Sequence, residues 1–296
     1  MTDSMGAAGS NPWMNFGPEL RDSRQLLLDV LRLLEDQSDA LTVLGAHAVY
    51  EQTKFVKDLP PMDSTADADL GVSPVLLVDT PRLDEVMSAA GLEPIHPDRP
   101  GVWGFTADEG QLTHQRMTID LIAPASVAGG GRRAAEVGRH GSRSVSKAQG
   151  TELSLIDRQW LELEAFSPGE PSGYAWVAGR AALICAKAYK IFDRLGAAEF
   201  ARNPPRYRPK DVADLFRLMA ASEGTEVRAV FAQGEADPQI ATAVLEGRKR
   251  LLELAERDEG KWLAGQVVEQ WSDGYFSRQQ IQDTFDRWFR SFVGVP

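Results

Sequence analysis

Two aspartates placed two positions apart, Asp67 and Asp69, constrain this chain more than any other sequence feature. They lie in the strand-like segment Ser64–Val72, where side chains alternate between two faces, so both carboxylates are expected on one face. Carboxylates held this close repel each other unless a cation joins them, and hard oxygen ligands of this kind suit Mg²⁺. The pair alone is weak evidence, because an acidic chain also places such pairs by chance at solvated strand ends.

A third acidic residue and a glycine extend this pattern. Asp120 lies within a second strand-like run, Arg116–Ile122, and a short apolar strand, Leu41–Leu44, ends at Gly45. If the strands that carry the three aspartates are neighbours, their carboxylates converge and can hold metal ions at one reacting phosphate. The sequence therefore predicts a metal site formed by Asp67, Asp69 and Asp120.

Length and composition allow the chain to form two domains. The chain has 296 residues, of which 43% are hydrophobic and 25% charged, and this is enough for two domains with their own cores. Cys185 is the only cysteine, which excludes an intrachain disulfide and fits a cytoplasmic location. No apolar run approaches the ~18 residues that a membrane span requires, so no membrane partner is expected.

The charge balance limits the partners that the chain can bind. The net charge of −11 repels nucleic acid, so RNA binding needs a local basic patch. Such a patch lies in the Gly- and Ser-rich stretch 129–150, which is expected to be a loop too polar to enter a core. Its basic residues are Arg132, Arg133, Arg139, His140, Arg143 and Lys147.

The pattern of apolar residues predicts an α+β fold, with a mixed β-sheet head domain followed by a C-terminal helical bundle. The expected strands in the head are 41–44, 64–72, a hairpin of 102–106 with 114–122, and a closing hairpin of 152–156 with 160–164. The expected helices are 20–34, 46–55, 82–90, 175–195, 209–221, 226–233, 238–257, 262–271 and 277–292. The composition changes near 167–173, which predicts a flexible tail at 1–19, a head domain at 20–167 and a helical domain at 168–296.

A second set of charged residues lies in the helical half. Lys187, Lys190 and Arg194 recur at helical spacing, so they share one face of a helix, and Asp211 and Asp214 share a face of the next helix. A basic row near a carboxylate pair suits a triphosphate site, where the cations neutralise phosphate oxygens. The alternative is a solvated helix face with ordinary ion pairs between helices.

Taken together, these motifs resemble those of the AbiEii/MenT-type nucleotidyltransferases, which belong to the polymerase-β-like nucleotidyltransferase superfamily. The shared order is strand–Gly, Thr-x-Asp-x-Asp-Leu, a later strand with one Asp, Lys…Lys…Arg on a helix, and then Lys-Asp-x-x-Asp. It extends from about Leu26 to Leu218 and consists of spacing and order rather than one long identical block.

The resemblance implies a role for each matching residue. Gly45 and Ala46 match the turn that lets backbone amides approach the triphosphate, and Lys190 and Arg194 extend that nucleotide-binding set. Asp67 and Asp69 match the metal-binding pair, whereas Asp120 matches the third carboxylate, which helps to activate the acceptor hydroxyl. Lys187 resembles the nucleotide-contacting lysine, and Asp211 the aspartate that follows Lys or Arg in the family motif.

The activity that this resemblance implies is Mg²⁺-dependent transfer of a nucleoside monophosphate from an NTP to an acceptor hydroxyl, with release of pyrophosphate. In toxin relatives the acceptor is tRNA and the partner is a cognate antitoxin of a toxin–antitoxin system. Two alternatives remain open: a nucleotidyltransferase that modifies small molecules such as antibiotics, and a nucleotide- or protein-binding module without turnover. Ala46 favours the last alternative, because the family prefers Ser or Gly after the glycine.

Overall fold

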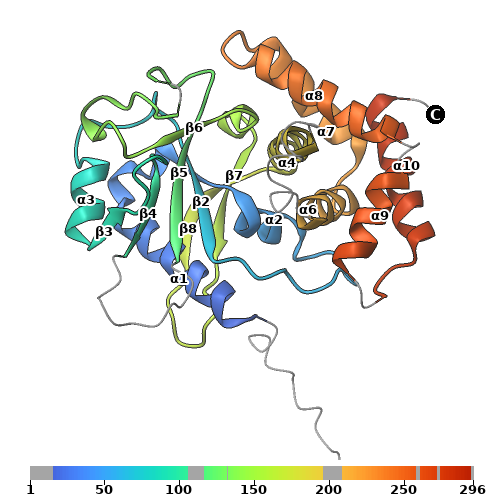
Figure 1. Ribbon diagram of the computed structural model, residues 1–296, viewed down its shortest axis with the longest axis horizontal. Helices are drawn as coiled ribbons and strands as arrows, with labels where there is room; N and C mark the ends of the chain where they lie inside the picture. The colour runs from blue at the N-terminus through green and yellow to red at the C-terminus, as the bar shows by residue number, and fades with distance from the viewer. Residues whose placement is uncertain are drawn as a thin grey trace, which may run out of the picture.

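The computed structural model describes residues 16–105, 117–131, 133–195, 209–257, 261–271 and 274–294. Figure 1 shows a β-sheet with its covering helices at one side of the molecule and a group of helices at the other. This is the α+β architecture predicted from the sequence, a mixed sheet followed by C-terminal helices.

The sheet is mixed, and its spatial order is β3-β4-β5-β2-β1-β8-β7, with β6 paired to β5. Strands β2 and β5 run parallel to each other, as do β1 and β8. The pairs β1–β2, β4–β5 and β7–β8 are antiparallel. The strands are β1 (Leu41–Val43), β2 (Asp67–Val72), β3 (Leu92–Pro94), β4 (Val102–Phe105), β5 (Thr118–Pro124), β6 (Ser146–Ala148), β7 (Arg158–Leu163) and β8 (Gly173–Ala178).

Period-two alternation in β2 separates the acidic face of the sheet from its apolar core. Ala68, Leu70 and Val72 alternate with the two aspartates and are at most 1% exposed. Helix α1 (Pro18–Leu33) packs against β2 and β5, and α2 (Gly45–Thr53) follows β1 directly and packs against β2. A shorter helix, α3 (Leu83–Ala89), packs beside β3.

The C-terminal part of the chain is helical and begins after β8, the last strand in sequence order. Helix α4 packs against α6 and α8, and the later helices pair with one another around an aromatic core in which Phe216 contacts the rings of Trp271, Phe276 and Phe285. No helix within the described part of the chain is long and apolar enough to cross a membrane. The helices are α4 (Arg180–Leu195), α6 (Pro209–Ala220), α7 (Gly224–Ala236), α8 (Ala241–Glu256), α9 (Lys261–Gln270) and α10 (Arg278–Val293).

Two predictions at the end of the head are wrong. The expected helix 175–195 begins only at Arg180, because residues 173–178 form strand β8. Residues 152–155 form a 3₁₀ turn rather than a strand, so the hairpin here is β7 with β8 and not 152–156 with 160–164. The aromatic-rich segment 173–178 alternates in burial, as a strand does, and lies next to β1.

The basic stretch 129–150 is also less polar than predicted. It contains strand β6 as well as the buried side chains of Val137, His140 and Val145. The Nδ1 atom of His140 accepts a hydrogen bond from the backbone N–H of Leu83 at 3.2 Å, which ties this stretch to α3.

The predicted domain boundary at about residue 168 falls between two paired strands of the sheet, since β7 precedes it and β8 follows it. Helices α4 and α6 of the C-terminal part pack against α2 of the head. The division into two domains stays a prediction, but these contacts bring the basic face of α4 to the side of the sheet on which α2 lies.

Candidate functional site

The three predicted carboxylates lie on one face of two neighbouring strands. Asp69 of β2 is the register partner of Asp120 of β5, and Asp67 is paired with Thr118. Register partners on parallel strands project toward the same face, so all three aspartates share a face of the sheet. The Asp67 side chain is exposed, whereas Asp69 and Asp120 are half-buried.

Crowding disfavours the ionised forms of two of these carboxylates. Burial and the charge of Asp67 raise the pKa of Asp69, and burial and the charge of Asp69 raise the pKa of Asp120 to about 7. The Oδ1 atom of Asp120 is buried and has no hydrogen-bond partner within the described residues. Such carboxylates are stabilised when a cation binds to them.

Asp67 differs from Asp69 and Asp120 because its carboxylate accepts a hydrogen bond from a nearby hydroxyl group. Thr65 donates a hydrogen bond to its carboxylate, and the Ser23 hydroxyl in turn donates to the Thr65 carbonyl at 2.8 Å. Desolvation by the surrounding protein works to raise the pKa of Asp67, but the Thr65 hydrogen bond and the charges of Lys190 and Lys210 outweigh it, so the pKa is lowered. This carboxylate is therefore ionised and fixed in direction.

Gly45 is required where β1 turns into α2. Its φ of +61° favours glycine, and a Cβ at this position would lie 1.8 Å from Oδ2 of Asp69. The backbone N–H of Leu44 also donates to the Asp69 carbonyl at 2.9 Å, which joins β1 to β2 here. The N-terminus of α2, with Gly45 and Ala46 as its first two residues, thus lies beside Asp69.

Replacing Gly45 with alanine is expected to destabilise the protein by about 3 kcal/mol, since the left-handed backbone costs ~1–2 kcal/mol and the overlap with Asp69 adds ~1–3 kcal/mol. Gly91→Ala is the matched control, because Gly91 has a φ of +81° but a Cβ added there would meet nothing within 4 Å. Urea unfolding of both variants separates the cost of the backbone from the cost of the contact. Equal losses would contradict a tight fit between Gly45 and Asp69.

Lys187, Lys190 and Arg194 lie on α4 and form ion pairs with aspartates of α6. The Nζ atom of Lys187 is 3.1 Å from Oδ1 of Asp211 and 2.6 Å from Oδ2 of Asp214. Lys190 lies 3.3 Å from Oδ1 of Asp211, and Arg194 pairs with the other oxygen of that carboxylate. Asp211 thus orients all three cations, and Asp214 adds a second anchor for Lys187.

Burial and pairing set the charges in this cluster. Burial works to lower the pKa of Lys187, but Asp214 and Asp211 outweigh it, so the pKa is raised. Burial works to raise the pKa of Asp211, but Lys187, Lys190 and Arg194 outweigh it, so that pKa is lowered. Lys187 and Asp211 are therefore both charged at neutral pH.

The carboxylates of the sheet and the basic residues of α4 lie close enough for their charges to interact. The charges of Lys190 and Lys187 act on Asp69, and that of Lys190 also acts on Asp67 and Asp120. Lys187 is 8% exposed and already bonded to two carboxylates, whereas Lys190 is 47% exposed. Lys190 is therefore the lysine of this row with surface available to a ligand.

Other residues join the site without having been predicted there. Thr65 holds Asp67, and Lys210 donates to the carbonyl of Ser64 at 2.9 Å. Arg99 reaches Asp120 from the loop between β3 and β4. The Thr-x-Asp spacing was a usable signal for Thr65, but nothing in the local sequence marks Arg99.

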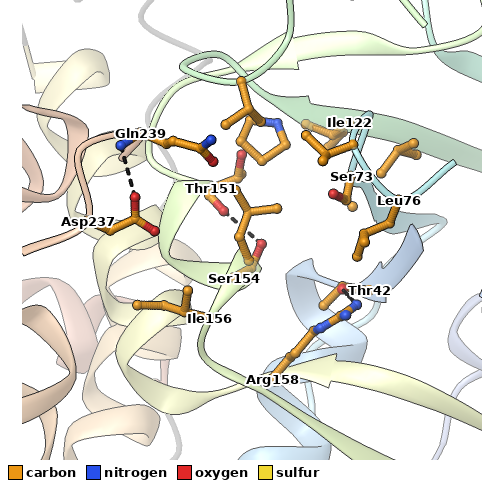
Figure 2. A pocket seen from close by; sticks show the side chains of 16 residues that line it. Thr42, Ser73, Leu76, Ile122, Thr151, Ser154, Ile156, Arg158, Asp237 and Gln239 are labelled. Atoms are coloured by element: carbon orange, nitrogen blue, oxygen red, sulfur yellow. Dashed lines mark hydrogen bonds between the residues drawn. The ribbon is translucent and has the colours of Figure 1, made fainter. Parts of the chain in front are cut away.

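The pocket in Figure 2 is a separate feature of about 210 Å³. The pocket is lined by Gly71 and Val72 of β2, by Ile122 and Pro124 of β5, and by Arg158 of β7. The residues from β2 and β5 lie toward the C-terminal ends of these strands, beyond the aspartates. None of the predicted site residues contributes to it, so this pocket is not the site described above.

No group of three His, Cys, Asp or Glu side chains within the described ranges forms a ready-made metal site. The donor set itself nevertheless suits a hard divalent cation, because Asp69 and Asp120 are crowded carboxylates and one oxygen of Asp120 has no partner. The chemistry of these donors therefore fits a hard divalent cation such as Mg²⁺.

No protein-family model and no curated protein sequence matches this chain. Among solved structures, it is similar to an antigenic nucleotidyltransferase-like protein from Paracoccidioides brasiliensis, with a TM-score of 0.38 and 12% sequence identity. The alignment covers 76% of this chain and 92% of that one. A likeness of this extent does not assign a function, so the functional argument depends on the site residues themselves.

Proposed function

We propose that this protein is a Mg²⁺-dependent nucleotidyltransferase that moves a nucleoside monophosphate from an NTP to an acceptor hydroxyl. One observation carries the proposal: Asp67, Asp69 and Asp120 share a face of two paired strands, directly beside a glycine-initiated helix and the basic face of α4. The resemblance to AbiEii/MenT-type enzymes in motif order supports the same activity.

In this proposal Asp67, Asp69 and Asp120 hold the metal, which supplies charge stabilisation at the transferred phosphoryl group. The N-terminus of α2 lies next to them and offers its free backbone N–H groups to phosphate oxygens. The acceptor oxygen gives its proton to Asp120 and bonds to the α-phosphorus. The bond from that phosphorus to the bridging oxygen breaks, and pyrophosphate leaves with the electron pair.

Lys190 is the residue proposed to neutralise the triphosphate, with Arg194 beside it. Lys187 and Asp211 then act as positioning residues, because Lys187 is enclosed by Asp211 and Asp214 and the same Asp211 carboxylate orients Lys190. This arrangement keeps the exposed lysine aimed at the acidic face of the sheet.

The direct test is incubation of the purified protein with each labelled NTP, Mg²⁺ and total tRNA. Label on RNA that disappears with EDTA supports the proposal with a tRNA acceptor and makes an antitoxin partner worth testing by co-expression. Label on a small-molecule acceptor instead supports the antibiotic-type alternative. NTP binding without transfer to any acceptor supports a nucleotide-binding module. Absence of NTP binding contradicts both transferase activities and the nucleotide-binding module, and favours a protein-binding module.

Lys190→Ala is expected to weaken NTP binding about 10- to 100-fold, the range for one charge-assisted hydrogen bond. Lys249→Ala is the control, since Lys249 is an exposed lysine of α8 whose described ion pair is with Glu253 on the same helix. Calorimetric titration with NTP and Mg²⁺ measures both. Equal NTP affinities in the two variants would show that Lys190 does not contact the triphosphate.

A further inference from the structure

Within the described part of the chain, Arg99 is the cation that forms an ion pair with one of the three carboxylates. Its Nη2 atom is 3.9 Å from Oδ2 of Asp120, and within the described residues no other ion pair involves Asp67, Asp69 or Asp120. The pair is loose and the Arg99 side chain is 61% exposed. The guanidinium group therefore has free donors beside the acidic face.

The loop that carries Arg99 is held in place by the basic stretch 129–150. Arg143 donates to the carbonyls of His96 and Pro97, and Arg133 donates to the carbonyl of Asp98 at 3.1 Å. Two arginines that composition alone assigned to an RNA-binding patch thus fix a neighbouring loop. Arg132 lies outside the described residues.

The end of this loop is equally constrained. The backbone N–H of Gly101 donates to the Arg143 carbonyl at 2.9 Å, and the N–H of Leu121 donates to the Gly101 carbonyl at 2.8 Å. Gly101 has a φ of +79°, and a Cβ there would lie 2.4 Å from the backbone nitrogen of Ser146. Arg99 is therefore presented to Asp120 by a loop fastened at both β5 and β6.

The strand order separates Arg99 from the other cations of the site. Strand β2 lies between β1 and β5; α2 follows β1, and α4 follows β8, which is the next strand on that side. Lys190 therefore approaches the carboxylates from the β1 side, whereas Arg99 approaches from the β4 side, next to Asp120. Lys190 and Arg99 therefore approach the three carboxylates from opposite sides. A group transfer brings two substrates to one reacting centre, so each side can serve one substrate.

We infer that Arg99 is a specificity-determining residue that binds a phosphate of an RNA acceptor next to its reacting hydroxyl. The inference rests on the proposed function, because it takes the β1 side as the NTP side. A planar guanidinium with free N–H groups suits bidentate phosphate binding. The same group would repel a cationic acceptor, and in a chain of net charge −11 such a contact is needed to hold RNA near the carboxylates.

The test measures binding of RNA and of nucleotide separately. A short single-stranded RNA with a free 3′-hydroxyl and a fluorescent 5′ end is titrated with the wild-type protein and with Arg99→Ala and Arg99→Lys, across a series of salt concentrations. Arg32→Ala is the control, since Arg32 is a part-exposed arginine of α1 whose described ion pair is with Asp29. Binding of NTP with Mg²⁺ is measured by calorimetry on the same samples.

Arg99→Ala is expected to weaken RNA binding about tenfold and to lower the slope of log affinity against log salt by about 0.7, the value for one phosphate contact on a single strand. Arg99→Lys retains part of the affinity, and NTP affinity is unchanged in both. An RNA affinity in Arg99→Ala equal to that of the control, or a wild-type protein that binds no RNA, would overturn the inference. If Arg99→Ala lowers NTP affinity instead, Arg99 contacts the triphosphate and not the acceptor, and the inference is wrong.

These readouts distinguish the two proposals. Failure of the wild-type protein to bind NTP contradicts the nucleotidyltransferase proposal, whatever the RNA titration shows. Normal NTP binding with RNA binding that is insensitive to Arg99 contradicts only the role of Arg99.

Discussion

Replacing Asp69 with asparagine is expected to abolish nucleotidyl transfer, with a loss of about 10²–10³-fold or more, because a charge that stabilises the reacting centre is removed. The fold is expected to survive. Burial and the charge of Asp67 disfavour the ionised form of Asp69 in the folded protein, so a neutral side chain of the same shape relieves repulsion. Transfer assays and thermal unfolding of the same samples measure both effects.

Metal binding gives this prediction a second readout. Mg²⁺ is expected to raise the unfolding midpoint of the wild-type protein, since a ligand that binds only the folded state stabilises it. The increase should disappear in Asp69→Asn and persist in Asp29→Asn, a control on α1 where Asp29 pairs with Arg32 at the surface. A midpoint of Asp69→Asn well below that of the wild type would contradict the repulsion argument, and retained transfer would contradict the role of Asp69.

Lys187→Met is expected to lower the free energy of unfolding by about 3–5 kcal/mol, because removing one partner of a buried ion pair leaves the other charge uncompensated. Lys187 is 8% exposed, and Asp211 and Asp214 are each 6% exposed. Asp211 keeps Lys190 and Arg194, whereas Asp214 keeps no ion-pair partner among the described residues. The cost therefore comes mainly from Asp214, and urea unfolding measures it.

A second substitution tests that explanation. Adding Asp214→Asn to Lys187→Met should recover much of the lost stability, since the orphaned carboxylate is then neutral. Lys249→Ala, at an exposed position of α8, should change stability by less than ~0.5 kcal/mol. A single Lys187→Met variant as stable as this control would show that the cluster is not buried in solution.

The pH dependence of this cluster follows from the directions of its pKa shifts. The raised pKa of Lys187 contributes stability below the ordinary lysine pKa, and this is lost as the pH rises through the folded-state value. The lowered pKa of Asp211 contributes stability above the ordinary aspartate pKa, and this is lost as the pH falls through the folded-state value. Lys187 and Asp211 should thus add no pH dependence to the stability of the wild-type protein between about pH 5 and 9, which urea unfolding across that range checks.

Local spacing was sufficient to predict the residues that share a face. The two-residue separation of Asp67 and Asp69 placed both on one side of a strand, and the spacing of Lys187, Lys190 and Arg194 placed them on one side of a helix. Such patterns depend only on the repeat of a strand or a helix, and the structure has a strand at the two aspartates and a helix at the three basic residues. By contrast, strand β8 was missed, because a short apolar segment carries no clear period of its own and owes its conformation to pairing with β1 and β7.

The sequence by itself determined the α+β class and the two charged faces, because both follow from the periodic spacing of residues along a strand or a helix. Only the tertiary structure decided that Asp69 and Asp120 are register partners, that Lys187 is enclosed by two carboxylates and that Arg99 stands beside Asp120. Each of these contacts joins segments at least 21 positions apart, counting from Arg99 to Asp120. Strand order and helix packing set such distances, and both depend on the burial of the whole core rather than on any local repeat.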